Sequence, residues 1–156
     1  MQIFVVNLNL LLMECSNKLL MKVQTLIKYR KNYFLARICH AILLHMGLDL
    51  PANVRLGKNV RFPHNSLGTV IHPNTIIEDE VWIYQNVTIG RADIEDFSDD
   101  GETQVIVHKG AKLCASAKIL CKKKLEIAEN TIIAANAVLL QSTGANEVWG
   151  GYLLNV

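Results

Sequence analysis

Residues 71–94 decide the fold, and they read IHPNTI-IEDEVW-IYQNVT-IGRADI. Each group of six begins with isoleucine, and the fifth residues are Thr75, Val81, Val87 and Asp93. This spacing is neither the 3.6-residue period of an amphipathic helix nor the two-residue period of an ordinary strand. A repeat this short indicates a small structural unit that is stacked many times.

The six-residue register continues on both sides of this stretch. Thirteen hexads, each led by an aliphatic residue or Phe, begin at Leu50, Leu56, Phe62, Ile71, Ile77, Ile83, Ile89, Val107, Leu113, Ile119, Ile127, Ile133 and Leu139. The fifth place is small or β-branched in eleven of them, and the exceptions, Asp93 and Lys123, lie where the register breaks. We therefore predict a left-handed parallel β-helix, a triangular coil with three hexads per turn and the leading residues inside.

Residues from about 8 to 47 follow a helical period instead, as in Leu19, Val23 and Leu26. This pattern predicts one or two amphipathic helices that end near Gly47. The fold class is therefore mainly β, with an α-helical N-terminal segment (1–47) followed by a β-helix domain (48–156). We expect the helices to cover the open end of the coil, because an uncovered strand edge invites aggregation.

Composition excludes several classes of protein. The formal net charge of the 156-residue chain is only +2 and no basic stripe accompanies it, so nucleic acid is not an expected partner. Its four cysteines, Cys15, Cys39, Cys114 and Cys121, form no CxxC pair, which favours reduced thiols and a cytoplasmic location. The apolar start of the chain is too short to cross a bilayer, so no integral membrane span is expected.

A regular prism has no pocket, so we expect function where the repeat is broken. The register breaks at residues 66–70, 91–104 and 122–126. His64 stands beside the first break, and an imidazole with an ordinary pKa near 6.5 suits proton abstraction at neutral pH. The alternative is an ordinary surface histidine.

The chain resembles the serine O-acetyltransferase group of hexapeptide-repeat acetyltransferases. The resemblance is carried by residues 48–57, His64, 68–71 and 84–90, and it extends over roughly residues 45–143. It implies an acyltransferase that takes its acetyl group from acetyl-CoA, with His64 as the general base and Asp49, fifteen residues earlier, orienting it. The alternative for Asp49 is a linker residue between helix and coil.

The same resemblance implies further site residues and a quaternary structure. The positions expected to contact acetyl-CoA, along an edge between subunits of a homotrimer, are Gly90, Ala115 and Ala135. Asn65 and Gln85 are expected to contact the small-molecule acceptor. No metal is expected. The alternative for the small residues is that they simply fit the coil.

The chain departs from the serine-specific members of the group in two places. Pro63 stands where those members have an acidic residue, and the long loop ends at 101–104 without an Arg or His. These departures favour a hydroxyl of a sugar or surface-polysaccharide precursor as acceptor, with serine O-acetylation in cysteine biosynthesis as the alternative. Several coil glycines and the usual C-terminal tail are also replaced, which motivates a third possibility, a non-catalytic trimeric assembly protein.

A metal enzyme on the same prism is the remaining rival. It resembles the γ-class carbonic anhydrases, with His64, His72 and His108 as candidate ligands. Zinc would need three imidazoles that converge and leave one open position.

Overall fold

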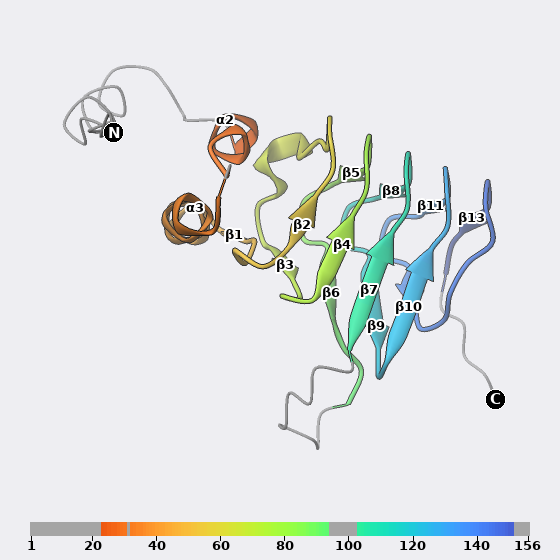
Figure 1. Cartoon of the computed structure of the whole chain (residues 1–156). Helices are drawn as coiled ribbons and strands as arrows, with labels where there is room; N and C mark the ends of the chain where they lie inside the picture. Colours follow the sequence, from red (N-terminus) through yellow and green to blue (C-terminus); the bar gives the residue numbers. More distant parts are fainter. Residues whose placement is uncertain (1–22, 31, 94–102, 152–156) are drawn as a thin grey trace, which may run out of the picture.

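The computed structural model describes residues 23–30, 32–93 and 103–151, which form two helices followed by a coil of short parallel strands (Figure 1). The helices are α2 (Val23–Lys28) and α3 (Tyr33–His45). The first sheet contains β1 (Leu48–Asp49), β3 (Thr69–Ile71), β6 (Thr88–Arg91), β9 (Lys118–Cys121) and β12 (Val138–Leu139). The second sheet contains β2 (Arg55–Leu56), β4 (Thr75–Ile77), β7 (Gln104–Val107) and β10 (Lys124–Ile127). The third sheet contains β5 (Trp82–Ile83), β8 (Lys112–Leu113), β11 (Ile132–Ile133) and β13 (Val148–Trp149).

Every paired strand runs parallel to its neighbour from the adjacent turn. In the third sheet, Ile83 is level with Leu113, and Leu113 is level with Ile133. These residues lead their hexads, so the register found in the sequence is also the register of the turns. The prediction of a left-handed parallel β-helix is confirmed.

The interior of the coil is a column of hexad leaders. Ile71, Ile77, Ile83 and Ile89 are each at most 1% exposed, and the compact residues in the fifth places are buried beside them. Leu56 is an exception, because it is only partly buried against the core. Burial of this many aliphatic side chains is the main favourable term in the stability of the coil.

Two corners of the triangle are built from residues with positive φ. Between the second and third sheets these residues are Asn59, Glu80, Gly110, Asn130 and Asn146. Between the third and first sheets the stacked residues are Gly47, Gly68, Asn86, Ser116 and Asn136. Asn and Gly tolerate this left-handed backbone best, which explains why they recur there. Most of the acidic break predicted at 91–104 lies outside the described residues, which omit 94–102.

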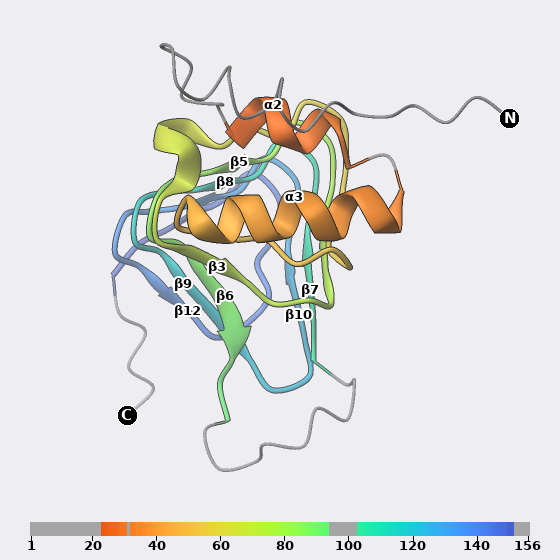
Figure 2. The same cartoon turned by 90° about the vertical axis from the view of Figure 1, so that its left-hand side faces the viewer.

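The two helices lie across the first turn of the coil, as predicted (Figure 2). Val23, Leu26 and Leu43 belong to the same buried cluster as the hexad leaders. Asn32 caps α3, since its side-chain oxygen accepts a hydrogen bond from the N–H of Leu35 at 2.9 Å. The part of the predicted helical segment before residue 23 lies outside the described residues.

Arg30 ties the end of α2 to the first turn of the coil. Its guanidinium donates to the carbonyls of Leu50, Pro51, Ala52 and Val54 at 2.9–3.3 Å. These contacts satisfy carbonyls at a corner that has no earlier turn above it.

No helix in the described ranges is both long and apolar enough to cross a membrane. The cysteines in those ranges, Cys39, Cys114 and Cys121, are free thiols.

Candidate active site

His64 lies in an unusual turn between the third and first sheets. Three consecutive residues, His64, Asn65 and Ser66, have φ values of 53°, 57° and 46°. Each non-glycine residue in this conformation costs roughly 1–2 kcal/mol, so the surrounding structure must hold the turn in place. Strained backbone of this kind clusters at functional sites, and the His64 side chain is exposed there.

Ser66 anchors this turn to the turn of the coil below. Its fully buried hydroxyl donates to the carbonyl of Ile83 at 2.6 Å. Ile83 belongs to β5, so the bond fixes the loop that carries His64 to a rigid strand.

Ser66→Ala is expected to lower kcat for the acetyl transfer proposed below about tenfold, because the turn that aims His64 loses its anchor. The KM for acetyl-CoA should stay unchanged. Ser142→Ala is the matched control, since the Ser142 hydroxyl also bonds to backbone of a neighbouring turn, the N–H of Glu126 at 2.9 Å, but far from His64. Steady-state kinetics of both variants check this, and an equal fall in kcat for the two would contradict it.

We call the stacked residues 63–68, 84–87, 114–117 and 134–137 the His64 corner. Of the residues selected from the sequence, Asn65, Gln85, Ala115 and Ala135 all lie here, one turn below another. Ala115 is half-buried and Ala135 is exposed, so small side chains line the edge. Gly90 does not belong to the corner; it lies on β6, level with Leu120 of β9.

Gln85 carries an unusual polar group. Its side-chain Oε1 is buried and has no hydrogen-bond partner among the described residues. An unpaired buried acceptor costs about 1–3 kcal/mol, so such atoms need a reason.

The structure places Asp49 against a different histidine from the expected one. Its Oδ1 lies 2.9 Å from Nε2 of His40, which projects from α3, and both side chains are about one-third exposed. No hydrogen bond joins Asp49 to His64 in the described part of the chain. The orienting role of Asp49 toward His64 therefore stays a prediction, and the contact with His40 is one that sequence reasoning missed.

Sequence reasoning also missed a row of aromatic side chains that leads away from His64. The ring of Tyr84 lies 6.4 Å from the imidazole of His64, and the ring of Trp82 lies 6.3 Å from Tyr84. Beyond them is an open hollow of about 440 Å³, lined by Gln24, Asn59, Arg61, Phe62, Pro63 and Trp82. Pro63, which lines the hollow, immediately precedes His64 in the chain.

The three histidines of the rival metal site lie at three different corners. His64 lies between the third and first sheets, His72 follows β3, and His108 follows β7. Within the described ranges, no group of three His, Cys, Asp or Glu side chains is arranged to hold a metal ion. One chain by itself does not bring the proposed ligands together.

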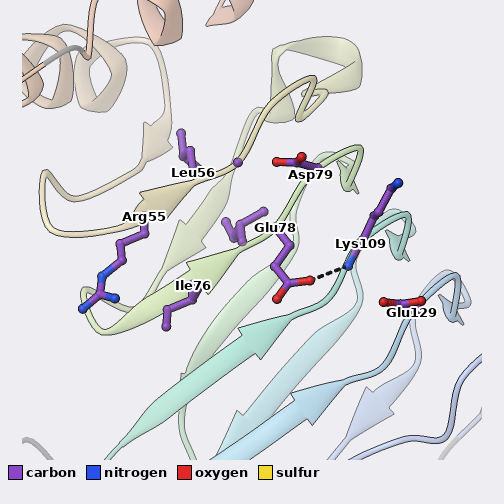
Figure 3. Close-up of a pocket in the computed structure, with 9 residues that line it drawn as sticks. Arg55, Leu56, Ile76, Glu78, Asp79, Lys109 and Glu129 are labelled. Atoms are coloured by element: carbon purple, nitrogen blue, oxygen red, sulfur yellow. Dashed lines mark hydrogen bonds between the residues drawn. The ribbon is translucent and has the colours of Figure 1, made fainter.

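A second hollow of about 440 Å³ lies at the corner between the second and third sheets, away from His64 (Figure 3). Glu78 there accepts a hydrogen bond from the backbone N–H of Lys109 at 3.0 Å, as the dashed line shows. The same carboxylate lies 3.1 Å from Nδ1 of His108, whose Nε2 lies 3.0 Å from Glu126. His108 thus links carboxylates from the turns above and below it.

This cluster is expected to make stability depend on pH. Hydrogen bonding to Glu126, and then to Glu78, raises the pKa of His108 above its ordinary value of 6.5. A histidine whose pKa is higher in the folded protein than in the unfolded chain stabilises the fold. This stabilisation is fully present below pH 6.5, and it is lost as the pH rises through the pKa of the folded protein. Hydrogen bonds from Lys124 and then from His108 lower the pKa of Glu126. The stability that Glu126 contributes is therefore lost as the pH falls through its pKa in the folded protein.

As the pH is raised above 6.5, the thermal unfolding midpoint should therefore decrease more in the wild type than in His108→Gln. His45→Gln, at the exposed end of α3, is the matched control and should follow the wild type. Parallel curves for wild type and His108→Gln would rule out the contribution of this cluster.

Several known proteins that resemble the chain are serine acetyltransferases. No family model matches it. A serine acetyltransferase from Staphylococcus aureus (strain Mu50) is 32% identical over 114 residues, which make up 72% of this chain and 50% of that protein. The structure of a Brucella abortus strain S19 serine acetyltransferase in complex with coenzyme A is 26% identical, with a TM-score of 0.59, covering 74% of this chain and 43% of that one.

A Neisseria gonorrhoeae serine acetyltransferase superposes with a TM-score of 0.70 at 19% identity, over 85% of this chain and 54% of that one. The chain spans between about a third and a half of the length of the curated relatives that it matches. The chain thus has the fold of solved serine acetyltransferases, a left-handed parallel β-helix.

Proposed function

We propose that this protein is an acetyltransferase that moves the acetyl group of acetyl-CoA to a hydroxyl of a small molecule, with His64 as the general base. The observation that carries the proposal is the strained turn that holds an exposed His64 beside a corner of small residues. The resemblance to serine acetyltransferases, one of them solved with coenzyme A, supports it.

In the proposed reaction, the oxygen of the acceptor hydroxyl attacks the thioester carbonyl of acetyl-CoA. At the same time, Nε2 or Nδ1 of His64 takes up the proton of that hydroxyl. The C–S bond then breaks, and the thiolate of coenzyme A takes up the proton that His64 held. The acetyl ester and the free thiol are the products. No enzyme nucleophile is needed, so none of the cysteines has a role in this scheme.

Ala115 and Ala135 are the proposed contacts for the pantetheine arm, because they lie on the edge that holds His64 and leave the backbone accessible. Gly90, on the outer face of β6, is proposed as a further contact. Gln85 and Asn65 are proposed to bind the acceptor, because both lie at the corner that carries His64.

Two acceptor classes compete. The names of the similar proteins favour serine. The replacement of an acidic residue by Pro63, and the absence of Arg or His at the end of the long loop, favour a sugar or surface-polysaccharide precursor. Both acceptors fit the same chemistry at His64.

A homotrimer with sites shared between subunits is the proposed assembly. Val70 on β3 and Leu140, directly after β12, are 45% and 54% exposed, which supports burial against another subunit. The molar mass measured by light scattering tests this, and a monomer at micromolar concentration contradicts it.

The decisive experiment follows thiol release from acetyl-CoA with serine and with a panel of free and nucleotide-linked sugars as acceptors. Turnover with serine, or with a sugar, assigns the acceptor class. Absence of both turnover and acetyl-CoA binding would overturn the proposal in favour of a non-catalytic assembly protein.

Asp49→Asn is expected to lower kcat roughly 10- to 100-fold, because the carboxylate that would stabilise protonated His64 becomes a neutral amide. His40→Gln keeps a donor for Asp49 and should have a smaller effect. Profiles of kcat against pH for both variants check this. If His40→Gln loses as much as Asp49→Asn, the carboxylate acts through His40 rather than through His64.

A further inference from the structure

A basic and aromatic cluster lies on the outer side of the third sheet, next to the His64 corner. Arg61 forms a parallel bridge with Trp82, and Trp82 is level with Lys112 of β8. The guanidinium carbon of Arg61 lies 4.9 Å from the centroid of the Trp82 ring, and Nζ of Lys112 lies 5.8 Å from it. Both distances are typical of cation–π contacts. We call these three residues the Trp82 cluster.

The two cations of this cluster have no carboxylate partner in the described part of the chain. Some other basic side chains there do have one: Arg91 pairs with Asp93 at 2.8 Å, and Lys124 pairs with Glu126. The cluster therefore concentrates two positive charges that a bound anion could neutralise.

The backbone around Arg61 is held from two sides. Gln24 of α2 donates to the carbonyl of Val60 at 2.7 Å and accepts from the N–H of Phe62 at 3.4 Å. Arg61 itself donates its N–H to the carbonyl of Val81 at 2.8 Å and accepts from the N–H of Ile83 at 2.9 Å. The ring of Trp82 then holds the guanidinium in place, so little entropy is lost when a ligand binds.

The cluster borders the site of the proposed chemistry. Arg61 and Trp82 line the same open hollow as Pro63, and His64 is the next residue. A molecule anchored at Arg61 could reach across the hollow to Pro63, the residue before His64. The hollow, of about 440 Å³, has room for more than a single small anion.

We propose that the Trp82 cluster binds the phosphate group of the acceptor whose hydroxyl His64 deprotonates. The planar guanidinium offers paired N–H donors that match phosphate oxygens, and the ammonium of Lys112 adds a second charge suited to a dianion. The acceptor class is then a phosphorylated or nucleotide-linked sugar. This inference rests on the proposed function for the role of His64, but not for the binding itself.

Binding can be measured without acetyl-CoA. The chain has two tryptophans, so Trp149→Phe leaves Trp82 as the sole indole reporter. We expect a saturable change of its fluorescence with glucose 1-phosphate and none with glucose or serine. Arg61→Gln should weaken binding at least about tenfold, the loss expected for a charged hydrogen bond. Arg55→Gln, an exposed arginine on the second sheet, is the matched control and should bind as before.

Three results would overturn the proposal. The first is no fluorescence response to glucose 1-phosphate, and the second is an equal loss of affinity in Arg61→Gln and Arg55→Gln. The third is a response to coenzyme A alone that disappears with dephospho-coenzyme A. The last result would assign the cluster to the acetyl donor instead. Calorimetry on the wild type guards against an effect of the Trp149 substitution. Phosphate binding without turnover and without acetyl-CoA binding would support the anion site and contradict the proposed function. Turnover without phosphate binding would support the proposed function and contradict this inference.

Discussion

His64→Asn is expected to lower kcat for acetyl transfer by about 10²- to 10⁴-fold, the usual contribution of a general base. Asparagine tolerates the left-handed backbone that His64 adopts but cannot take up a proton at neutral pH. The substitution therefore removes the base and keeps the turn. Thiol release from acetyl-CoA, with whichever acceptor proves active, measures the effect.

The control for this variant is His45→Asn, because His45 is an exposed histidine at the end of α3. Its kcat should equal that of the wild type. Both variants should bind acetyl-CoA and show the same far-ultraviolet circular dichroism as the wild type. A His64→Asn protein that retains more than a tenth of wild-type kcat would exclude His64 as the base.

Gly57→Ala is expected to destabilise the protein by about 3 kcal/mol, at the upper end of the usual cost of overpacking. A Cβ atom at Gly57 would lie 2.5 Å from the backbone nitrogen of Asp79 and 2.5 Å from the carbonyl carbon of Glu78. Because both atoms belong to the backbone of the next turn, the turns themselves must move apart. The thermal midpoint should fall by roughly 6–12 °C.

Gly150→Ala is the matched control for this effect. A Cβ atom there would meet only the Cβ of Ala134, at 3.5 Å, which is ordinary contact. Calorimetric midpoints of the two variants should therefore differ widely. If they coincide, the close approach of the turns at Gly57 does not limit stability.

The period of six predicted the core well because it encodes which residues face inward. Ile71, Ile77, Ile83 and Ile89 are buried as their places in the hexads require. Leu56 is less buried than its place suggests, because it lines an open hollow between the helices and β2. The left-handed winding also followed from the repeat.

The candidate site was only partly predictable. The break in register marked the loop of His64, and Asn65, Gln85, Ala115 and Ala135 do share its corner. The contact of Asp49 with His40 was not visible, because it depends on how α3 packs on the coil. The Trp82 cluster was missed for a related reason. Its members come from three successive turns, and the breaks in register conceal which outward residues lie level.

The hydrogen bonds of Arg30 to the first turn have a consequence for how the chain folds. Every later turn of a stacked coil has a finished layer to build on, but the first has none. Four carbonyls of that first corner are instead held by one guanidinium at the end of α2. We therefore expect these contacts to stabilise the first turn, so that later turns can stack on it in the order in which they are synthesised.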